Sequence, residues 1–478
     1  MRLKIKIWQT ILLSAILNFT LAPPILADNE QTLSLDQVLS SSIRHTPRIL
    51  EAIERQRRAI AKQLAATGNF DSSFQQNSLF WLSGFYNGSY IDNSFVKPLE
   101  NSGGKIYGGY RSGTGTFPVY EDELITLNRG EFNVGVLFPL LRNRNFDERR
   151  YQLRNSELNI ELTQADILLT KVQVQHNAMI AYWRWLAVGR RLAVYDHLLK
   201  IAEQRVLAFS ELFAAGNIAE IDLVENTQNV LKRRARVARA HGEFEVAALT
   251  LSLYYRDENG DPKSPQQAQL PSVFPTINLS TLQHVDKDIE KALLRQAELN
   301  RIDIEMEQAK LQLKLGENLL KPQVDLGVKA ARDIGDGRNS SVGNDLIVEL
   351  EVSVPIGRRT ARGEIGASKA RLSELFFERQ QVQEQLKTNI KQLTFSLNAA
   401  AEFADLARQE VTQAARLESA ERKRQIEGAS TFFLLNLREE NTADAKVRGI
   451  FSKLSYFEAL TNYYAATVNT DAFRISNP

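Results

Sequence analysis

The sequence predicts a mainly α protein with a transmembrane β-barrel, arranged as two copies of a strand–long helix–turn–helix unit. Two alternating segments end in Pro139 and Pro355, which lie 216 positions apart. A helical pattern follows each proline and ends at Gly216 or Gly428, which lie 212 positions apart. Internal repetition on this scale indicates a duplicated architecture. Each helical run covers roughly seventy residues, or about 100 Å, so we expect an elongated molecule.

The first residues have the pattern of an export signal. A basic start at 2–6 is followed by an apolar core at 11–19 and a cleavage site before Asp28, so residues 1–27 are expected to be a signal peptide. A single membrane anchor is the alternative. It is less favoured because Asn18 and the prolines at 23–24 interrupt a run that is too short to span a bilayer.

The composition excludes several kinds of protein. The 478 residues contain no cysteine, which excludes disulfides, thiolate metal sites and a cysteine nucleophile. The formal net charge is +2, and it falls to about −1 without the three basic residues of the expected signal. Because the chain has no basic excess, we expect no nucleic-acid partner.

The first unit is expected to cover residues 28–275. A helical pattern at 35–67 ends at Gly68, as helices often end at glycine. An aromatic strand at about 70–86 follows, and residues 87–128, rich in Gly, Ser, Asn and Tyr, are interpreted as a long loop. Apolar and polar residues alternate over 131–139, which predicts a strand. A helical hairpin at about 146–254 and a polar linker at 255–275 complete the unit.

The second unit, 276–478, is expected to contain a helix at 285–320, strands at 323–331 and 346–355, and a helical hairpin at about 359–468. Each strand has an apolar and a polar side, as outer-membrane strands do. The charged residues of the polar side are Asp325, Lys329, Glu349 and Glu351. We expect them to face the barrel lumen, because charge on the lipid side is costly. The alternative is that they are solvated residues near the strand ends.

Both hairpins carry an apolar seam with a period of 3.5 residues, over 158–186 in the first unit and 386–414 in the second. Such a seam lets helices pack side by side with a left-handed supercoil. The corners between strand and helix contain Pro139, Pro355, Arg358 and Arg359. We expect the two arginines to lie where barrel becomes tunnel and to pair with acids or lipid headgroups.

One chain cannot close the predicted sheet. Backbone amides find no partner in lipid, so a sheet in the bilayer must form a closed barrel. The four predicted strands are too few, since the smallest membrane barrels have eight. The chain is therefore expected to form an oligomer, and closure alone does not choose between two, three or four copies.

The duplicated strand–proline–arginine corner, the long helices and the turns at 216–223 and 428–435 resemble the TolC-like outer membrane factor family over about 35–470. The resemblance implies a homotrimer, with a 12-stranded barrel in the outer membrane and an α-helical tunnel across the periplasm. It also implies a passive exit duct of a tripartite efflux or type I secretion system. The expected partners are a periplasmic adaptor (membrane fusion) protein, an inner-membrane pump and outer-membrane lipid.

In that family the two interhelical turns form the periplasmic tip, where gating and docking take place. The corresponding residues here are Glu220, Asp222, Glu225, Phe432, Phe433, Leu434 and Leu437, beside the turn glycines Gly216 and Gly428. Two positions of the second turn that are often acidic in the family are Leu434 and Leu437, which favours an apolar constriction or an adaptor-binding surface. The alternatives are acids stabilised by a helix N-terminus and an apolar core of the helix pair.

No constellation of residues supports catalysis, so an enzyme is not expected, and no cofactor or metal is predicted. The five histidines are scattered without metal-ligand spacing. His176 lies in the apolar seam and is expected to be a hydrogen-bonded packing residue. The alternative function is a periplasmic adaptor or structural coiled-coil protein, although an adaptor typically has one helical hairpin and this chain has two.

Overall fold

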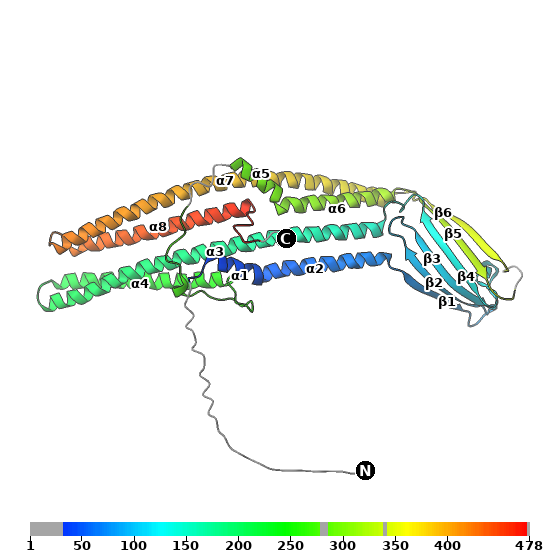
Figure 1. The fold of residues 1–478 in the computed structure, drawn as a ribbon, viewed down its shortest axis with the longest axis horizontal. Helices are drawn as coiled ribbons and strands as arrows, with labels where there is room; N and C mark the ends of the chain where they lie inside the picture. Colours follow the sequence, from blue (N-terminus) through cyan, green and yellow to red (C-terminus); the bar gives the residue numbers. More distant parts are fainter. Residues whose placement is uncertain (1–31, 278–284, 338–341, 476–478) are drawn as a thin grey trace, which may run out of the picture.

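The computed structural model describes residues 32–277, 285–337 and 342–475. The expected signal peptide, residues 1–27, lies outside the described residues. The molecule is long and gently curved, with a sheet at one end and the two interhelical turns at the other (Figure 1). The prediction of a mainly α, elongated fold is confirmed. Among the described residues, no helix is both long and apolar enough to cross a membrane.

The described residues form eight α-helices and three short 3₁₀ turns. The helices are α1 Leu35–His45, α2 Pro47–Thr67, α3 Glu148–Ala214, α4 Glu220–Ser252, α5 Val285–Arg295, α6 Ala297–Leu319, α7 Arg359–Ile426 and α8 Phe432–Ala466. The 3₁₀ turns are η1 Gly68–Phe70, η2 Val119–Leu124 and η3 Gln267–Gln269. The long pair α3 and α7 runs most of the length of the molecule (Figure 1).

Two predicted helices are each divided in the structure. The helix expected at 35–67 breaks at Thr46, and the helix expected at 285–320 breaks at Gln296. Both residues have extended backbone, with ψ of 122° and 108°. The first break has a local cause, because Pro47 disfavours helical conformation in the residue before it and suits the first position of the next helix.

The helices form a single curved layer. Toward the turns, the packed neighbours are α4 with α3, α3 with α8, and α8 with α7. Toward the sheet, they are α2 with α3, α3 with α6, and α6 with α7. Four helices therefore lie side by side along the whole length, and the outer ones are α2 and α4 on one edge and α7 on the other.

The main core lies in the middle of this layer. Trp183 of α3 stacks on Phe457 of α8 at a ring distance of 4.5 Å, and Phe274 of the linker stacks on the same phenylalanine at 5.8 Å. The buried side chain of Gln175 donates to the carbonyls of Leu39 and Phe473, at 2.9 and 3.0 Å. These contacts hold α1, the linker and the C-terminal segment against the long helices.

The sheet has six antiparallel strands in sequence order. They are β1 Ser73–Phe80, β2 Ser89–Pro98, β3 Lys105–Thr114, β4 Glu131–Pro139, β5 Gln323–Asp333 and β6 Asn344–Ser353. The prediction of a long loop over 87–128 is wrong, because β2 and β3 lie within it. The prediction of four strands per chain is wrong for the same reason.

Close backbone approach explains why β3 resembled a loop in the sequence. A Cβ at Gly109 would lie 2.5 Å from the carbonyl oxygen of Asn93 on β2. A Cβ at Gly113 would lie 1.8 Å from the carbonyl oxygen of Leu124. Glycine is therefore required at these positions of the strand, although glycine usually weakens a strand and marks a turn.

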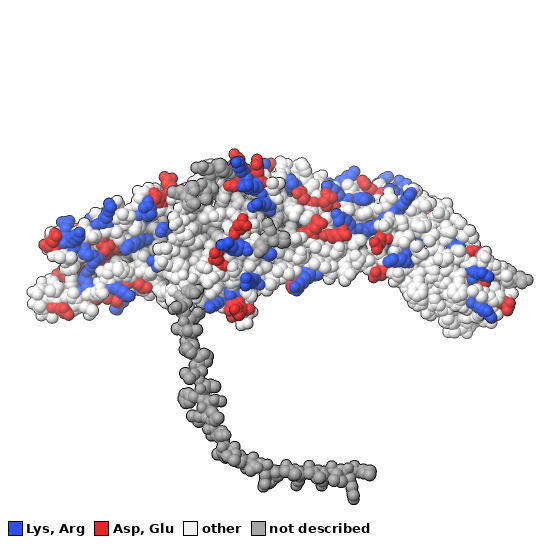
Figure 2. Space-filling view, viewed as in Figure 1, with Lys and Arg blue, Asp and Glu red and all other residues white. Residues whose placement is uncertain are grey.

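The six strands share one apolar side and one polar side. One row of paired residues across the sheet lies on the apolar side. It consists of Phe74, Phe95, Gly108, Val134, Ala330 and Leu346. The row three positions further along β1 lies on the polar side, and it pairs Asn77, Asp92, Arg111, Glu131 and Asp333. Phe95 and Leu346 are 64% and 74% exposed, so the apolar side is uncovered in the single chain. Figure 2 shows mixed charges along the helices and few on the visible part of the sheet.

Candidate functional site

The two interhelical turns lie together at the end of the molecule farthest from the sheet (Figure 1). Gly216 and Gly428 have φ of +73° and +77°, which glycine adopts without steric cost. The amide of Asn217 donates to the carbonyl of Leu212 at 2.9 Å, and the amide of Ala429 donates to that of Arg424 at 2.8 Å. Both turns are therefore Schellman motifs that end α3 and α7 and reverse the chain.

The acidic residues of the first turn occupy the start of α4. Glu220 and Asp222 are exposed in its first turn, and Glu225 is half-buried. The partial positive charge of a helix N-terminus stabilises carboxylates at such positions. Their location fits this role, and lining of a pore by these residues stays a prediction.

Phe432 packs between the two hairpins. The ring of Phe432 contacts that of Phe209 on α3 edge-on, with centroids 4.5 Å apart. The guanidinium of Arg205, also on α3, lies 5.8 Å from the Phe432 ring centroid. Leu435 is buried. Of the apolar residues predicted at the second turn, Phe432 therefore joins the two hairpins.

The other apolar residues predicted at the second turn are exposed to different degrees. Phe433 is 64% exposed and Leu437 is 44% exposed, whereas Leu434 is half-buried. The second turn therefore presents an apolar surface beside its packed core. The single chain leaves this pair uncovered.

Behind the turns, four helices meet at a buried group of charges. Glu439 of α8 is 2% exposed and accepts hydrogen bonds from Arg205 of α3 at 2.6 Å, Arg422 of α7 at 3.3 Å and Arg233 of α4 at 3.4 Å. Glu440 lies 3.6 Å from Arg233 as a further ion pair. We call these five residues the tip ion cluster.

The tip ion cluster depends on mutual neutralisation. Burial lowers the pKa of the Arg233 guanidinium from its ordinary value, and attraction to Glu439 and Glu440 opposes that effect. An arginine in a protein nevertheless stays protonated. Separating the α3/α4 hairpin from the α7/α8 hairpin would take Arg205 and Arg233 away from their carboxylate partners and leave Glu439 with Arg422 alone. The cluster therefore holds the hairpins together near the tip.

Sequence reasoning missed this cluster, although a signal for it exists. Arg233 lies seven residues before Ala240 and eighteen before Leu251, both buried, and so falls on the buried side of α4. A charged residue in phase with the apolar positions of a helix needs a buried partner. The sequence does not reveal that the partner is Glu439, about 200 positions away.

The two strand-to-helix corners differ. Pro139 is the last residue of β4, whereas Pro355 follows β6 by two residues. Arg358 caps α7 with a φ of +48°, and both Arg358 and Arg359 are exposed. Pairing of these two arginines with acids or lipid headgroups stays a prediction. At the first corner Arg150 pairs with Asp147 at 2.9 Å.

The charged residues predicted for the lumen lie on the polar side of the sheet. Strand register places Asp325 opposite Glu351, and Gly327 opposite Glu349. Lys329 lies 3.0 Å from Glu131 of β4, which also accepts from Arg111 of β3 at 2.7 Å. Arg111, Glu131 and Lys329 therefore form an ionic network on the polar side that includes an unpredicted strand, β3.

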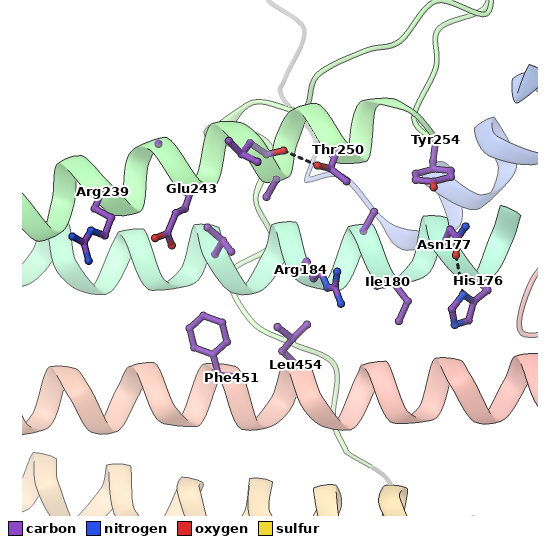
Figure 3. Close-up of a pocket in the computed structure, with 15 residues that line it drawn as sticks. His176, Asn177, Ile180, Arg184, Arg239, Glu243, Thr250, Tyr254, Phe451 and Leu454 are labelled. Atoms are coloured by element: carbon purple, nitrogen blue, oxygen red, sulfur yellow. Dashed lines mark hydrogen bonds between the residues drawn. The ribbon is translucent and has the colours of Figure 1, made fainter. Parts of the chain in front are cut away.

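A groove with a volume of about 780 Å³ lies between α3, α4 and α8 (Figure 3). Its lining is largely apolar and includes Ile180, Phe451 and Leu454. At one end His176 places Nε2 2.7 Å from Oδ1 of Asn462, which confirms the hydrogen-bonded packing role predicted for this histidine. In the described part of the chain, no cluster of His, Cys, Asp or Glu could hold a metal ion.

No protein-family model matches this sequence, and no curated protein does either. Solved structures do match the fold. The Campylobacter jejuni CmeC outer membrane channel has 12% identity and a TM-score of 0.62, over 91% of this chain and 85% of that chain. The Vibrio cholerae outer membrane protein VceC has 14% identity and a TM-score of 0.61, over 91% and 95%. The Neisseria gonorrhoeae MtrE outer membrane channel, in its open state, has 13% identity and a TM-score of 0.62, over 91% and 88%.

This chain has the fold of outer membrane channels. The resemblance stated from the sequence is thereby confirmed for the fold. At identities of 12–14%, these structures support the fold but not the function. The function must therefore be inferred from the surfaces described above.

Proposed function

We propose that the protein is the outer-membrane exit duct of a tripartite efflux or type I secretion system, a passive channel that extends into the periplasm. In this proposal three copies close into one tube. The sheets form a barrel in the outer membrane, and the helical layers form the tunnel. A periplasmic adaptor and an inner-membrane pump complete the path.

The observation that carries the proposal is a second apolar stripe on the outer helices α4 and α7. On α7, the buried residues Ile390, Leu397 and Ala404 face the rest of the chain. Phe377, Phe395, Leu406 and Leu417 lie on the opposite side, at spacings of 18 and 11 residues that return to one side of a helix. They are 66%, 74%, 56% and 52% exposed.

The other edge of the layer has a matching stripe. Five residues of α4 and its C-cap lie opposite the buried side, and each is more than half exposed: Val224, Leu231, Val246, Leu249 and the C-cap Leu253. Two apolar edges on opposite sides of a curved layer are complementary in a head-to-tail ring, where α4 of one copy meets α7 of the next. Exposed apolar surface of this extent indicates an interaction site.

The sheet supports a membrane location for its end of the molecule. Its uncovered apolar side suits lipid, and its polar side suits an aqueous lumen. A periplasmic adaptor has no need of a six-stranded sheet with one bare apolar side, which disfavours the alternative function. The exposed Phe433 and Leu437 are the surface we propose for docking of the adaptor at the tip.

Mass measurement and electrical recording of the purified protein in detergent test the proposal together. We expect a particle of three protomers that conducts ions in planar bilayers. A monomer without conductance would refute the duct.

A matched pair of variants tests the edge contact. Phe395→Asp places a charge on the exposed stripe of α7 and is expected to yield monomers. Asn389→Asp places the same charge on an exposed position of α7 outside the stripe, six residues from Phe395 and about 120° around the helix, and is expected to leave the oligomer intact. Equal oligomerisation of both variants would exclude the stripe as the interface.

A further inference from the structure

The strand count of this chain points to an unusual barrel. Three copies with four strands each would supply twelve strands, but the described residues of each copy form six. The added strands β2 and β3 do not form a separate lobe. They lie in the interior of the sheet, paired residue by residue with β1 and β4.

Side-chain contacts tie the added strands to the rest of the sheet on both sides. On the polar side, Arg111 of β3 pairs with Glu131 of β4, and these side chains are only 14% and 8% exposed. On the apolar side, the rings of Phe95 on β2 and Phe74 on β1 lie 5.0 Å apart. Both faces of the sheet therefore continue through β2 and β3 without interruption.

In one chain, the sheet and the helical layer have similar widths when all six strands are counted. At a spacing of about 4.8 Å and a tilt of about 40°, six strands occupy about 38 Å of a barrel wall, and four strands only about 25 Å. Four helices packed at about 8–10 Å occupy about 32–40 Å. Six strands and four helices can thus close around the same axis with the same number of copies.

The two free edges are also compatible with closure. Every residue of β1 and of β6 is exposed, so neither edge is covered within the chain. Because the number of strands is even and the order is sequential, β1 and β6 run in opposite directions. Placing β6 of one copy beside β1 of the next keeps the sheet antiparallel throughout and continues its apolar side.

We propose that all six strands enter the closed wall, so that three copies form an 18-stranded barrel in which β6 of each copy pairs with β1 of its neighbour. This inference rests on the proposed trimeric duct and departs from the 12-stranded barrel that the sequence resemblance implied. A barrel of about 16–18 strands encloses an aqueous channel.

Cysteine cross-linking of the full-length oligomer tests the edge pairing, because the natural chain contains no cysteine. Glu349→Cys on β6 is combined in turn with a cysteine at each polar-side position of β1: Ser73, Gln75, Asn77 or Leu79. On a denaturing gel without reductant, at least one combination is expected to give covalent dimers and trimers that disappear on reduction.

Two further pairs make the result decisive. Glu349→Cys with Asn133→Cys on β4 is the control, since both neighbours of β4 belong to its own chain, and it is expected to give no ladder. Glu349→Cys with Lys105→Cys on β3 tests a 12-stranded ring that leaves β1 and β2 outside. A ladder with β3, or a trimer by mass with no ladder at any β1 position, would overturn the 18-stranded barrel. A monomer with no ladder would instead overturn the proposed duct.

Discussion

The tip ion cluster yields a prediction that can be worked out from the structure. Glu439→Gln keeps the shape of the side chain but removes the charge that Arg205, Arg233 and Arg422 share. Arg205 and Arg233 have side chains only 9% and 1% exposed, so they would stay buried with less compensation. Removing one partner of a buried ion pair costs about 3–5 kcal/mol. We expect the lower end, about 3 kcal/mol, because Glu440 remains beside Arg233.

Hydrogen exchange of the assembled protein measures this cost where it acts. A loss of about 3 kcal/mol corresponds to exchange faster by a factor on the order of 100, since each 1.4 kcal/mol is tenfold. The acceleration is expected in the tip-proximal parts of α4 and α8, which open locally when the hairpins separate. The central core around Trp183 is expected to exchange as in the natural protein.

A matched control separates this effect from loss of any ion pair. Glu410 and Arg448 also join α7 to α8, but their side chains are 47% and 52% exposed. Exposed pairs contribute only about 0–1 kcal/mol, so Glu410→Gln is expected to change exchange by less than about tenfold. If Glu439→Gln exchanges as slowly as the natural protein at the tip, the cluster does not hold the hairpins together.

Three further predictions concern the helices and the core. Trp185→Ala removes a side chain that is 0% exposed, so it is expected to lower the free energy of unfolding by about 3–5 kcal/mol. A much smaller decrease in thermal or denaturant unfolding would contradict the assigned core. Gly428→Ala, at a φ of +77°, is expected to lower the free energy of unfolding by about 1 kcal/mol, because alanine is strained in this backbone conformation. Gly363→Ala, in open space within α7, is expected to raise the free energy of unfolding by up to about 1 kcal/mol, because alanine favours a helix. A change of the same sign in both variants would refute this reasoning. Burial raises the pKa of Tyr182 to about 12, and its hydroxyl donates to the Leu33 carbonyl, so the neutral phenol is favoured in the folded state. Its contribution to stability is complete below the unfolded pKa of about 10 and is lost as pH rises toward 12. Tyr182→Phe should therefore lose less stability over this range, and equal losses in parallel unfolding titrations would contradict the shift.

The long helices and their turns could be predicted because their signals are local. The apolar seams mark the buried side of each helix, and Leu186, Ile390 and Leu397 are buried as that periodicity requires. Gly216 and Gly428 end their helices with a backbone that favours glycine. The break at Thr46 was also accessible, since Pro47 follows it, whereas Gln296 has no comparable neighbour.

The strands β2 and β3 were not accessible in the same way. Glycine and serine at 108–113 favour a turn when judged locally, but their lack of bulk is what lets neighbouring backbone approach. Strand formation there is decided by pairing with β4 and by the salt bridge of Arg111 with Glu131. Both are contacts between separate segments, and the secondary-structure propensity of one segment cannot predict them.

The sequence by itself therefore determined the helical duplication, the reversal points and which side of each long helix is apolar. Only the tertiary structure decided the number of strands, the partners of Glu439 and the exposure of a second apolar stripe on α4 and α7. The physical reason is that periodicity along a chain reports that a side is apolar, but not what covers it. In this protein one apolar side of α7 packs on its own chain, and the other, with Phe395, is left for a neighbour.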